Sequence, residues 1–176
     1  MGELVVVTGP PGAGKSSVSE ELARTHTPSA LVPGDSFFAM IKQGYVLPWL
    51  PRARRQNSVV IEAAAAAAGR LSDIGLVVYD GVLGPWFLPN FVRRSGVGEV
   101  HYVILLPPLH VCLERVETRV DHSFSDLAVT QDMYQQFASA RIDARHLITA
   151  ADDHPAQLAE LIAQRLDEGQ FRYSLS

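Results

Sequence analysis

The sequence of 176 residues has one cysteine, Cys112, and no uninterrupted apolar stretch of the roughly 20 residues that span a bilayer. A single cysteine excludes an intrachain disulfide and a cysteine-rich metal site, and we expect it to be a small buried side chain. The first residues, MGELVVVTG, carry neither the basic segment nor the cleavage site of a secretory signal. We therefore expect a soluble, cytoplasmic protein without a membrane partner.

Positive charge is also scarce, because 15 Lys and Arg residues face 19 Asp and Glu residues, for a formal net charge of -4. The chain as a whole has no long-range attraction for polyanions, which argues against a nucleic-acid partner. The guanine-specifying motif N-K-x-D is absent, and the length is about that of one domain. These absences argue against a switch GTPase and a multidomain motor, and nothing in the sequence sets the oligomeric state.

Apolar runs alternate with helical patterns along the chain. Strands are predicted over residues 4–8, 30–33, 75–80, 100–106 and 146–149, and helices over residues 16–26, 52–71, 109–120, 131–145 and 155–169. Continuous apolar strands separated by helices are typical of a parallel sheet covered on both faces. The sequence predicts a single α/β domain over residues 1–176, with a five-stranded parallel sheet in three layers. The alanine run 63–68 indicates tight helix packing.

A phosphate-binding motif, GPPGAGKSS, lies between the first predicted strand and the first predicted helix. It fits G-x-x-x-x-G-K-[ST] in full and has the flanking strand and helix that its chemistry requires. The glycines let successive N–H groups converge on phosphates, and the helix start adds partial positive charge. Lys15 is predicted to reach the β- and γ-phosphates of ATP, and Ser16 to ligate Mg²⁺. The predicted nucleotide-binding residues of the loop are Gly9, Pro10, Pro11, Gly12, Ala13, Gly14, Lys15, Ser16 and Ser17.

Two aspartates follow predicted strands at the same edge of the predicted sheet. Asp80 closes the run GLVVYD and is the candidate second ligand of Mg²⁺, since this ion prefers carboxylate and water oxygens; the alternative is a solvated turn aspartate. Asp35 follows the second strand in VPGDSFF and is the candidate general base for an acceptor hydroxyl. A helix N-cap is the alternative for Asp35, because Asp is a favoured capping residue.

A helical lid is predicted over about residues 115–140. Arg115 and Arg119 are four residues apart and share a helix face, so both are candidates to neutralise the transferred phosphoryl group, and Arg115 also to bind the nucleotide. Arg141 and Arg145 repeat this spacing on the next predicted helix. The alternative is an ordinary solvated face, because Glu114 and Glu117 offer ion-pair partners.

An acceptor-binding region is predicted over about residues 36–58, where aromatic residues, prolines and arginines are interleaved. The aromatic members suit a small organic acceptor, and the arginines suit an anionic one. Trp86, which follows Asp80, adds an aromatic side chain near the same edge; each aromatic residue has packing as its alternative. The predicted acceptor-binding residues are Asp35, Phe38, Tyr45, Trp49, Arg52, Arg55 and Trp86.

The order GPPGAGKSS, GDSF, VVYDG and ERVETR resembles the small P-loop kinases of the nucleoside-monophosphate-kinase-like superfamily. Within it the chain is most similar to gluconate-kinase-like proteins of the AAA_33 type, chloramphenicol phosphotransferase and zeta-toxin-type kinases. The spacing of Gly34 and Asp35 from GY-x-x-PW, residues 44–49, carries part of this likeness. The pattern DGFPR of the monophosphate kinases is not present, because Asp80 and Gly81 continue as VLGPW.

The resemblance implies an ATP-dependent phosphotransferase of the P-loop NTPase fold, with a helical lid and an acceptor-binding region after the second strand. It implies that Asp35 activates the acceptor, that Arg115 and Arg119 belong to the lid, and that residues 149–155 hold adenine through backbone contacts.

The function expected from the sequence is transfer of the ATP γ-phosphoryl group to a hydroxyl of a sugar, an antibiotic or a related metabolite. Two alternatives stay open. One is a polynucleotide kinase or a zeta-toxin-like nucleotide-sugar kinase, which the arginine cluster permits. The other is an ATP-binding regulator without phosphotransfer.

Overall fold

The computed structural model describes residues 2–118, 126–150 and 154–175. Its sheet has the strand order β2-β3-β1-β4-β5, with all neighbouring pairs parallel, and β6 pairs antiparallel with β4. The strands are β1 (Leu4–Thr8), β2 (Ser29–Pro33), β3 (Leu76–Asp80), β4 (Glu99–Leu105), β5 (Leu147–Ile148) and β6 (Arg172–Ser174). The five predicted parallel strands are confirmed. The short β6, which has little apolar pattern, was not predicted.

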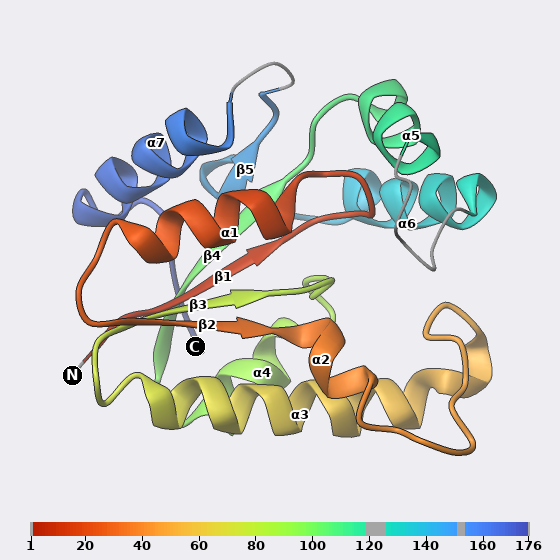
Figure 1. Cartoon of the computed structure of the whole chain (residues 1–176), viewed down its shortest axis with the longest axis horizontal. Coiled ribbons are helices and arrows are strands. Elements are labelled where there is room, and N and C mark those ends of the chain that lie inside the picture. The colour runs from red at the N-terminus through yellow and green to blue at the C-terminus, as the bar shows by residue number, and fades with distance from the viewer. Residues whose placement is uncertain (1, 119–125, 151–153, 176) are drawn as a thin grey trace.

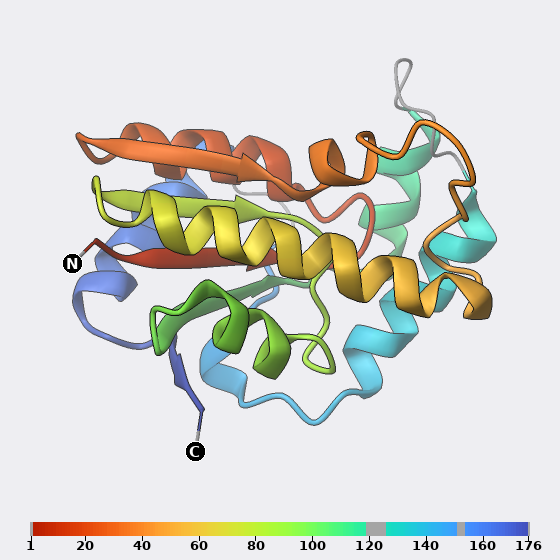
Figure 2. The ribbon, with the colours of Figure 1, turned by 90° about the horizontal axis from the view of Figure 1, so that it is seen from below.

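Helices cover both faces of the sheet, as the continuous apolar strands predicted (Figure 1). The helix α1 packs against α7 on one face, and α3 packs against α4 on the other (Figure 2). The helical elements are α1 (Lys15–Arg24), α2 (Gly34–Phe38), η1 (Pro51–Ala53), α3 (Arg54–Leu71), α4 (Leu88–Ser95), α5 (Leu109–Glu117), α6 (Leu127–Ser139), η2 (Ala144–His146) and α7 (Pro155–Asp167). None of these helices is long and apolar enough to cross a bilayer.

The alanine run packs α3 tightly against its neighbours. Ala64, Ala65 and Ala68 are buried in the core on this face of the sheet. Gly69 continues the contact, because a Cβ atom there would lie 1.8 Å from the backbone oxygen of Ser95 at the end of α4. The alanines therefore serve close helix approach, as predicted.

The predicted helix over residues 131–145 was wrong at its end. The helix α6 stops at Ser139, and Ala140 is extended with ψ of 146°. Asp143 then caps a separate turn, η2, by accepting a hydrogen bond from the backbone N–H of Arg145 at 3.1 Å. Arg141 and Arg145 consequently do not share a helix face. After α6, residues 140–143 lead the chain through η2 into β5.

The helices α2 and α4 were not predicted. The helix α2 is five residues long and carries no apolar period. The helix α4 begins with a proline in its first turn and ends at Gly96, which has φ of 73°. Proline at the start and glycine after the end are typical helix boundaries, so this signal could have located α4.

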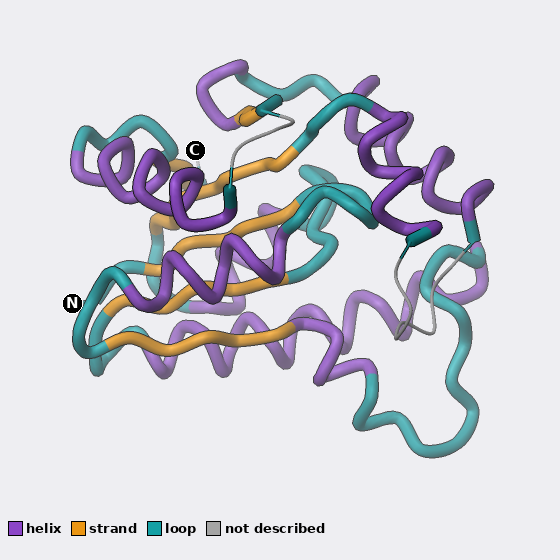
Figure 3. The backbone as a smooth tube through the Cα atoms, turned by 45° about the horizontal axis from the view of Figure 1, so that its top comes forward, coloured by secondary structure: helices purple, strands orange, loops and turns teal. Residues whose placement is uncertain are grey.

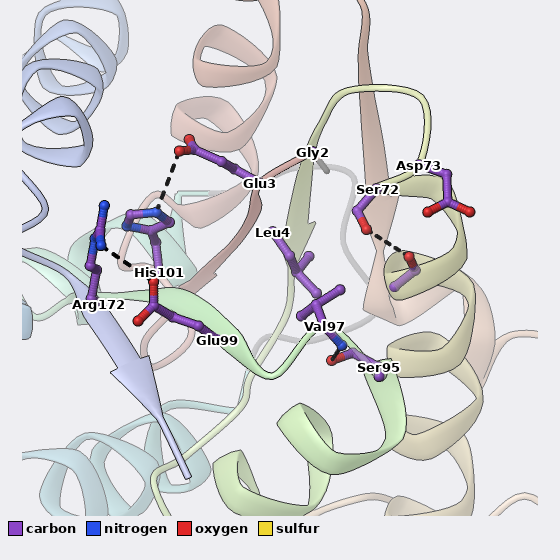
Figure 4. A pocket seen from close by; sticks show the side chains of 12 residues that line it. Gly2, Glu3, Leu4, Ser72, Asp73, Ser95, Val97, Glu99, His101 and Arg172 are labelled. Carbon is purple, nitrogen blue, oxygen red and sulfur yellow. Dashed lines mark hydrogen bonds and ion pairs between the residues drawn. The ribbon is translucent and has the colours of Figure 1, made fainter.

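The loops after β1 and β3 gather at the carboxyl end of the sheet, with α2 directly after β2 (Figure 3). At the opposite end, a cavity of about 320 Å³ lies among the starts of β1 and β4, the ends of α3 and α4, and β6 (Figure 4). Two ion pairs lie within its lining: Glu3 Oε1 lies 4.0 Å from His101 Nε2, and Glu99 Oε1 lies 3.7 Å from Arg172 Nη1. Both pairs lie at the end of the sheet that is remote from the phosphate motif.

Two buried histidines make stability depend on pH. His101 lies in β4 beside Glu3, and the Nδ1–H of His146 donates to the carbonyl oxygen of Tyr102 at 2.8 Å. Burial lowers the pKa of both imidazoles below the ordinary 6.5, against opposing effects of Glu3 on His101 and of the Tyr102 hydrogen bond on His146. Because the unfolded chain then binds more protons near pH 6, this contribution to stability is lost as the pH falls through the lowered pKa values.

We therefore expect the free energy of unfolding, measured by urea titration, to decrease from pH 7.5 to pH 5.5. His101→Gln and His146→Gln should each flatten this dependence, since each removes one titrating group. His110→Gln, which removes an exposed imidazole, serves as the control. An unchanged slope in both core variants would contradict the assignment.

Candidate active site

The phosphate motif forms a loop between β1 and α1 whose glycines permit close backbone approach. Gly12 has φ of 76°, and a Cβ atom there would lie 2.2 Å from the backbone oxygen of Cys112. Gly14, with φ of 92°, is the N-cap of α1, and no side chain caps this helix. The N-cap residue therefore has no side chain that would occupy the helix start, where phosphate groups typically bind. Pro10, Gly12 and Ala13 are buried, whereas Ser16 and Ser17 are exposed.

Lys15 and Ser16 extend from this loop towards β3. The Lys15 ammonium group donates a hydrogen bond to the backbone oxygen of Pro10 at 3.0 Å, so it lies over the loop. Burial raises the pKa of the Asp80 carboxyl, while the Lys15 charge and a hydrogen bond from Ser16 oppose the rise. The three side chains therefore form one cluster at the carboxyl end of the sheet.

The pair of Ser16 and Asp80 fits a magnesium site. A hydroxyl and a partly desolvated carboxylate are oxygen donors, and Mg²⁺ typically takes only one or two protein ligands beside water and phosphate oxygens. Among the residues that the structure describes, no group of three or more His, Cys, Asp and Glu side chains could hold a metal. An ion here would complete its coordination with phosphates of a nucleotide.

Asp35 lies in the first turn of α2, and its side chain is exposed. The N-cap of α2 is Pro33, and no side-chain capping bond is present, so the alternative of a capping aspartate does not hold. The charge of Asp35 contributes to raising the pKa of Asp80 and of Tyr45, after burial in both cases. Pro33, two residues before Asp35, pairs with Asp80, so the strand register brings the Asp35 segment beside the candidate metal ligand.

Tyr79 lies between the two aspartate-bearing turns and was not predicted as a site residue. A Cβ atom would lie 2.6 Å from its hydroxyl at Gly34 and 2.7 Å at Gly81, so both glycines are required by this close approach. Burial, followed by the charges of Asp35 and Asp80, raises the pKa of the Tyr79 phenol, which keeps it neutral. The glycine beside each aspartate, in GD and DG, was the available signal.

Arg115, on α5, lies against the phosphate loop. Its Nη1 atom is 3.5 Å from the backbone oxygen of Gly12, so the guanidinium group borders the phosphate-binding backbone. Cys112, one turn earlier, is fully buried as expected, and burial raises the pKa of its thiol against the charges of Lys15 and Arg115. Arg119 lies outside the described residues.

A cavity of about 310 Å³ adjoins the phosphate loop on the α7 side. The predicted adenine loop, residues 149–155, contributes Ala150 and Pro155, while residues 151–153 lie outside the described residues. The lining of this cavity combines apolar side chains, such as Val18 and Leu158, with polar ones, among them Arg115. Its lining residues are Ala13, Gly14, Ser17, Val18, Arg115, Thr118, Ala150, Pro155 and Leu158.

The aromatic residues of the predicted acceptor region are only partly covered. Phe38 is half-buried, and the exposed fractions are 44% for Tyr45 and 36% for Trp49. Burial, followed by the charge of Asp35, raises the pKa of the Tyr45 phenol. An electrostatic effect therefore links Tyr45 to Asp35.

The predicted acceptor-binding set also contains Trp86, Arg52 and Arg55. The Trp86 ring contacts Phe137 on α6 with a centroid distance of 5.8 Å, which favours packing, although 49% of the residue is exposed. Arg52, in η1, and Arg55, in the first turn of α3, are exposed. The geometry brings together Lys15, Ser16, Asp35, Asp80 and Arg115, with Tyr45 beside them.

Residues 5–145 match the family AAA_18, described as an AAA domain. None of the curated proteins matches the chain. Among solved structures, the tunicamycin resistance protein of Deinococcus radiodurans aligns with a TM-score of 0.68 and 19% identity, covering 94% of this chain and 96% of its own. A sugar kinase from a Janibacter species gives a TM-score of 0.71, 20% identity and 95% coverage of both chains. A gluconokinase from Sinorhizobium meliloti gives 0.65, 22% identity, and coverage of 96% and 94%. These likenesses confirm the predicted fold.

The candidate metal ligands predict how nucleotide affinity depends on Mg²⁺. In calorimetric titrations with a non-hydrolysable ATP analogue, Ser16→Ala and Asp80→Asn should reduce the gain in affinity due to Mg²⁺ by at least the roughly tenfold that loss of a supporting group costs at metal sites. Without Mg²⁺, Asp80→Asn should bind the analogue as well as the wild type or better, because a negative charge near the phosphates is removed. Asp73→Asn, remote from the loop, is the control. Retention of the full Mg²⁺ effect in both site variants would exclude this metal site.

Proposed function

The chain belongs to the AAA_18 family and has the fold of the small P-loop kinases, and we propose that it transfers the γ-phosphoryl group of ATP to a hydroxyl of a small-molecule acceptor. The observation that carries the proposal is the position of Asp35. This carboxylate is exposed, does not cap α2, and lies two residues after Pro33, which pairs with Asp80 across β2 and β3. A nucleotide switch has no need of such a group.

In the proposed reaction the acceptor hydroxyl attacks the γ-phosphorus atom of ATP. Its proton passes to the carboxylate of Asp35 as the new oxygen–phosphorus bond forms, and the bond to the β,γ-bridging oxygen breaks. Lys15 and Arg115 lie at the phosphate loop, where they would offset the negative charge that develops on the departing ADP. Ser16 and Asp80 would hold Mg²⁺, which neutralises phosphate charge when bound.

Coverage and charge support a small acceptor over a polynucleotide. A sugar kinase and a gluconokinase share nearly the full length of the fold, whereas a chain of the Pnkp1/Rnl/Hen1 RNA repair complex aligns over 78% of this chain and 44% of its own. The net charge of -4 gives the chain no general attraction for a polyanion. Exposed Arg52 and Arg55 would instead contact an anionic group of a small acceptor, if that acceptor carries one.

The first experiment identifies the acceptor. Purified protein is incubated with labelled ATP and Mg²⁺ and with sugars, aminoglycosides, phenicols, nucleosides, nucleotide sugars and a 5′-hydroxyl oligonucleotide in turn. We expect one class of small hydroxyl compound to stimulate phosphate transfer above the rate with ATP alone. Phosphorylation of the oligonucleotide alone would support the polynucleotide kinase, and no stimulation by any compound would count against a kinase.

The second experiment tests Asp35 as the base. Asp35→Asn preserves size and polarity but cannot take a proton, so kcat should fall by about 10²-fold to 10⁴-fold. Affinity for ATP, measured by calorimetry, should stay within about twofold, because Asp35 lies in α2 and not in the phosphate loop. Asp73→Asn controls for loss of a carboxylate. Equal kcat in Asp35→Asn and the wild type would remove the basis for the mechanism and would favour a regulator that binds ATP.

A further inference from the structure

Residues 39–50, the acceptor loop, extend beyond the carboxyl end of the sheet, between α2 and η1 (Figure 2). This loop carries Tyr45 and Trp49. It contains no helix or strand, and side chains from another element add to the few hydrogen bonds that it makes within itself and with α2. Two such side chains come from the start of α3.

Gln56 binds the acceptor loop at two points. Its side-chain oxygen accepts a hydrogen bond from the backbone N–H of Val46 at 2.8 Å, and its side-chain nitrogen donates to the backbone oxygen of Val46 at 2.7 Å. One planar amide therefore satisfies both polar groups of a single loop residue. Such a two-point contact fixes orientation as well as position, since a rotation of the loop would break both bonds.

Asn57 adds a third bond to the same loop. Its side-chain nitrogen donates to the backbone oxygen of Pro48 at 2.7 Å, whereas its side-chain oxygen is buried without a hydrogen-bond partner. Residues 46 and 48 are thus both hydrogen-bonded to α3. Gly44 precedes them with φ of 73°, and no described atom lies within 4 Å of the position that a Cβ atom would take there. The part of the loop after Gly44 is therefore the part that α3 holds.

The helix α3 is itself anchored independently of these contacts. Val60, Ile61 and the buried alanines pack it into the core further along the helix. The side-chain hydrogen bonds of Gln56 and Asn57 reach only the acceptor loop. Loss of Gln56 should therefore release the loop without unfolding the helix.

We propose that Gln56, supported by Asn57, is a positioning residue that holds the acceptor loop in its binding conformation, so that Tyr45 borders the acceptor beside Asp35. This inference rests on the proposed function for its kinetic consequence, but the ordering of the loop can be measured without an acceptor. Pre-ordering a loop lowers the entropy that binding must offset, so its loss weakens acceptor binding and spares the nucleotide.

The first test follows the loop through Trp49. The chain has two tryptophans, so Trp86→Phe leaves Trp49 as the single indole. In that background, Gln56→Ala should raise the acrylamide quenching constant of Trp49 fluorescence about twofold, as a partly covered ring becomes accessible. Gln43→Ala removes an exposed glutamine from the same loop and should leave the constant unchanged. Equal quenching in the two variants would overturn the proposal.

The second test separates positioning from stability, with Trp86 intact. Gln56→Ala should raise KM for the acceptor about tenfold, because acceptor binding must then order the loop, while KM for ATP stays at the wild-type value and the melting temperature falls by only a few degrees. Gln56→Glu keeps the acceptor atom for the Val46 N–H but loses the donor, so its KM should lie between those of the wild type and Gln56→Ala. Gln164→Ala, which removes an exposed glutamine from α7, is the control for the kinetic constants.

The outcomes distinguish failure of the Gln56 proposal from failure of the proposed kinase function. Increased quenching with an unchanged acceptor KM would show that the loop is ordered by Gln56 but does not bind the acceptor, which overturns the proposal and leaves the kinase intact. A wild-type protein that phosphorylates no acceptor would instead defeat the proposed function. The quenching experiment would then still decide whether Gln56 orders the loop.

Discussion

The candidate active site depends on the parallel register of β3 between β1 and β2. Asp80 pairs with Val7 on one side and with Pro33 on the other, which brings the end of β3 level with the start of the phosphate loop and with the turn that carries Asp35. The side chains then interact electrostatically, as the effects of Lys15 and Asp35 on the pKa of Asp80 indicate. Residues 76–79 of β3 are all buried, so a slip of one residue would move each side chain into the helix layer on the opposite face, and packing on both faces enforces this register.

Close contacts at glycines set the spacing at the carboxyl end of the sheet. Gly12 lies directly on the backbone of Cys112, which places α5 against the phosphate loop and Arg115 beside it. The hydroxyl of Tyr79 similarly fills the space between Gly34 and Gly81. Close packing of this kind transmits small displacements, because few voids are present to absorb them. Close packing thus holds α5 against the phosphate loop and Tyr79 against the segments that carry Asp35 and Asp80.

The fold was largely predictable because its signals are local. The apolar strands and the start of α1 follow directly from period and motif, and Asp35, Asp80 and Arg115 lie at the expected edge. The end of α6 was wrong, because the turn capped by Asp143 competes with a continued helix. Tyr79 and Gln56 were not predicted as site residues, because a buried strand residue and a glutamine within a helix belong to no recognisable sequence motif. Their roles arise from neighbours far away in the sequence.

The sequence by itself determined the phosphate-binding loop, because GPPGAGKSS is contiguous and its backbone conformation follows from its own glycines and the helix after it. It also indicated which aspartates end strands. Only the tertiary structure decided that Asp35 is not a cap, that Trp86 packs on Phe137, and that Gln56 binds Val46. These facts depend on which surfaces meet when the sheet and helices pack, and the local sequence does not specify that meeting.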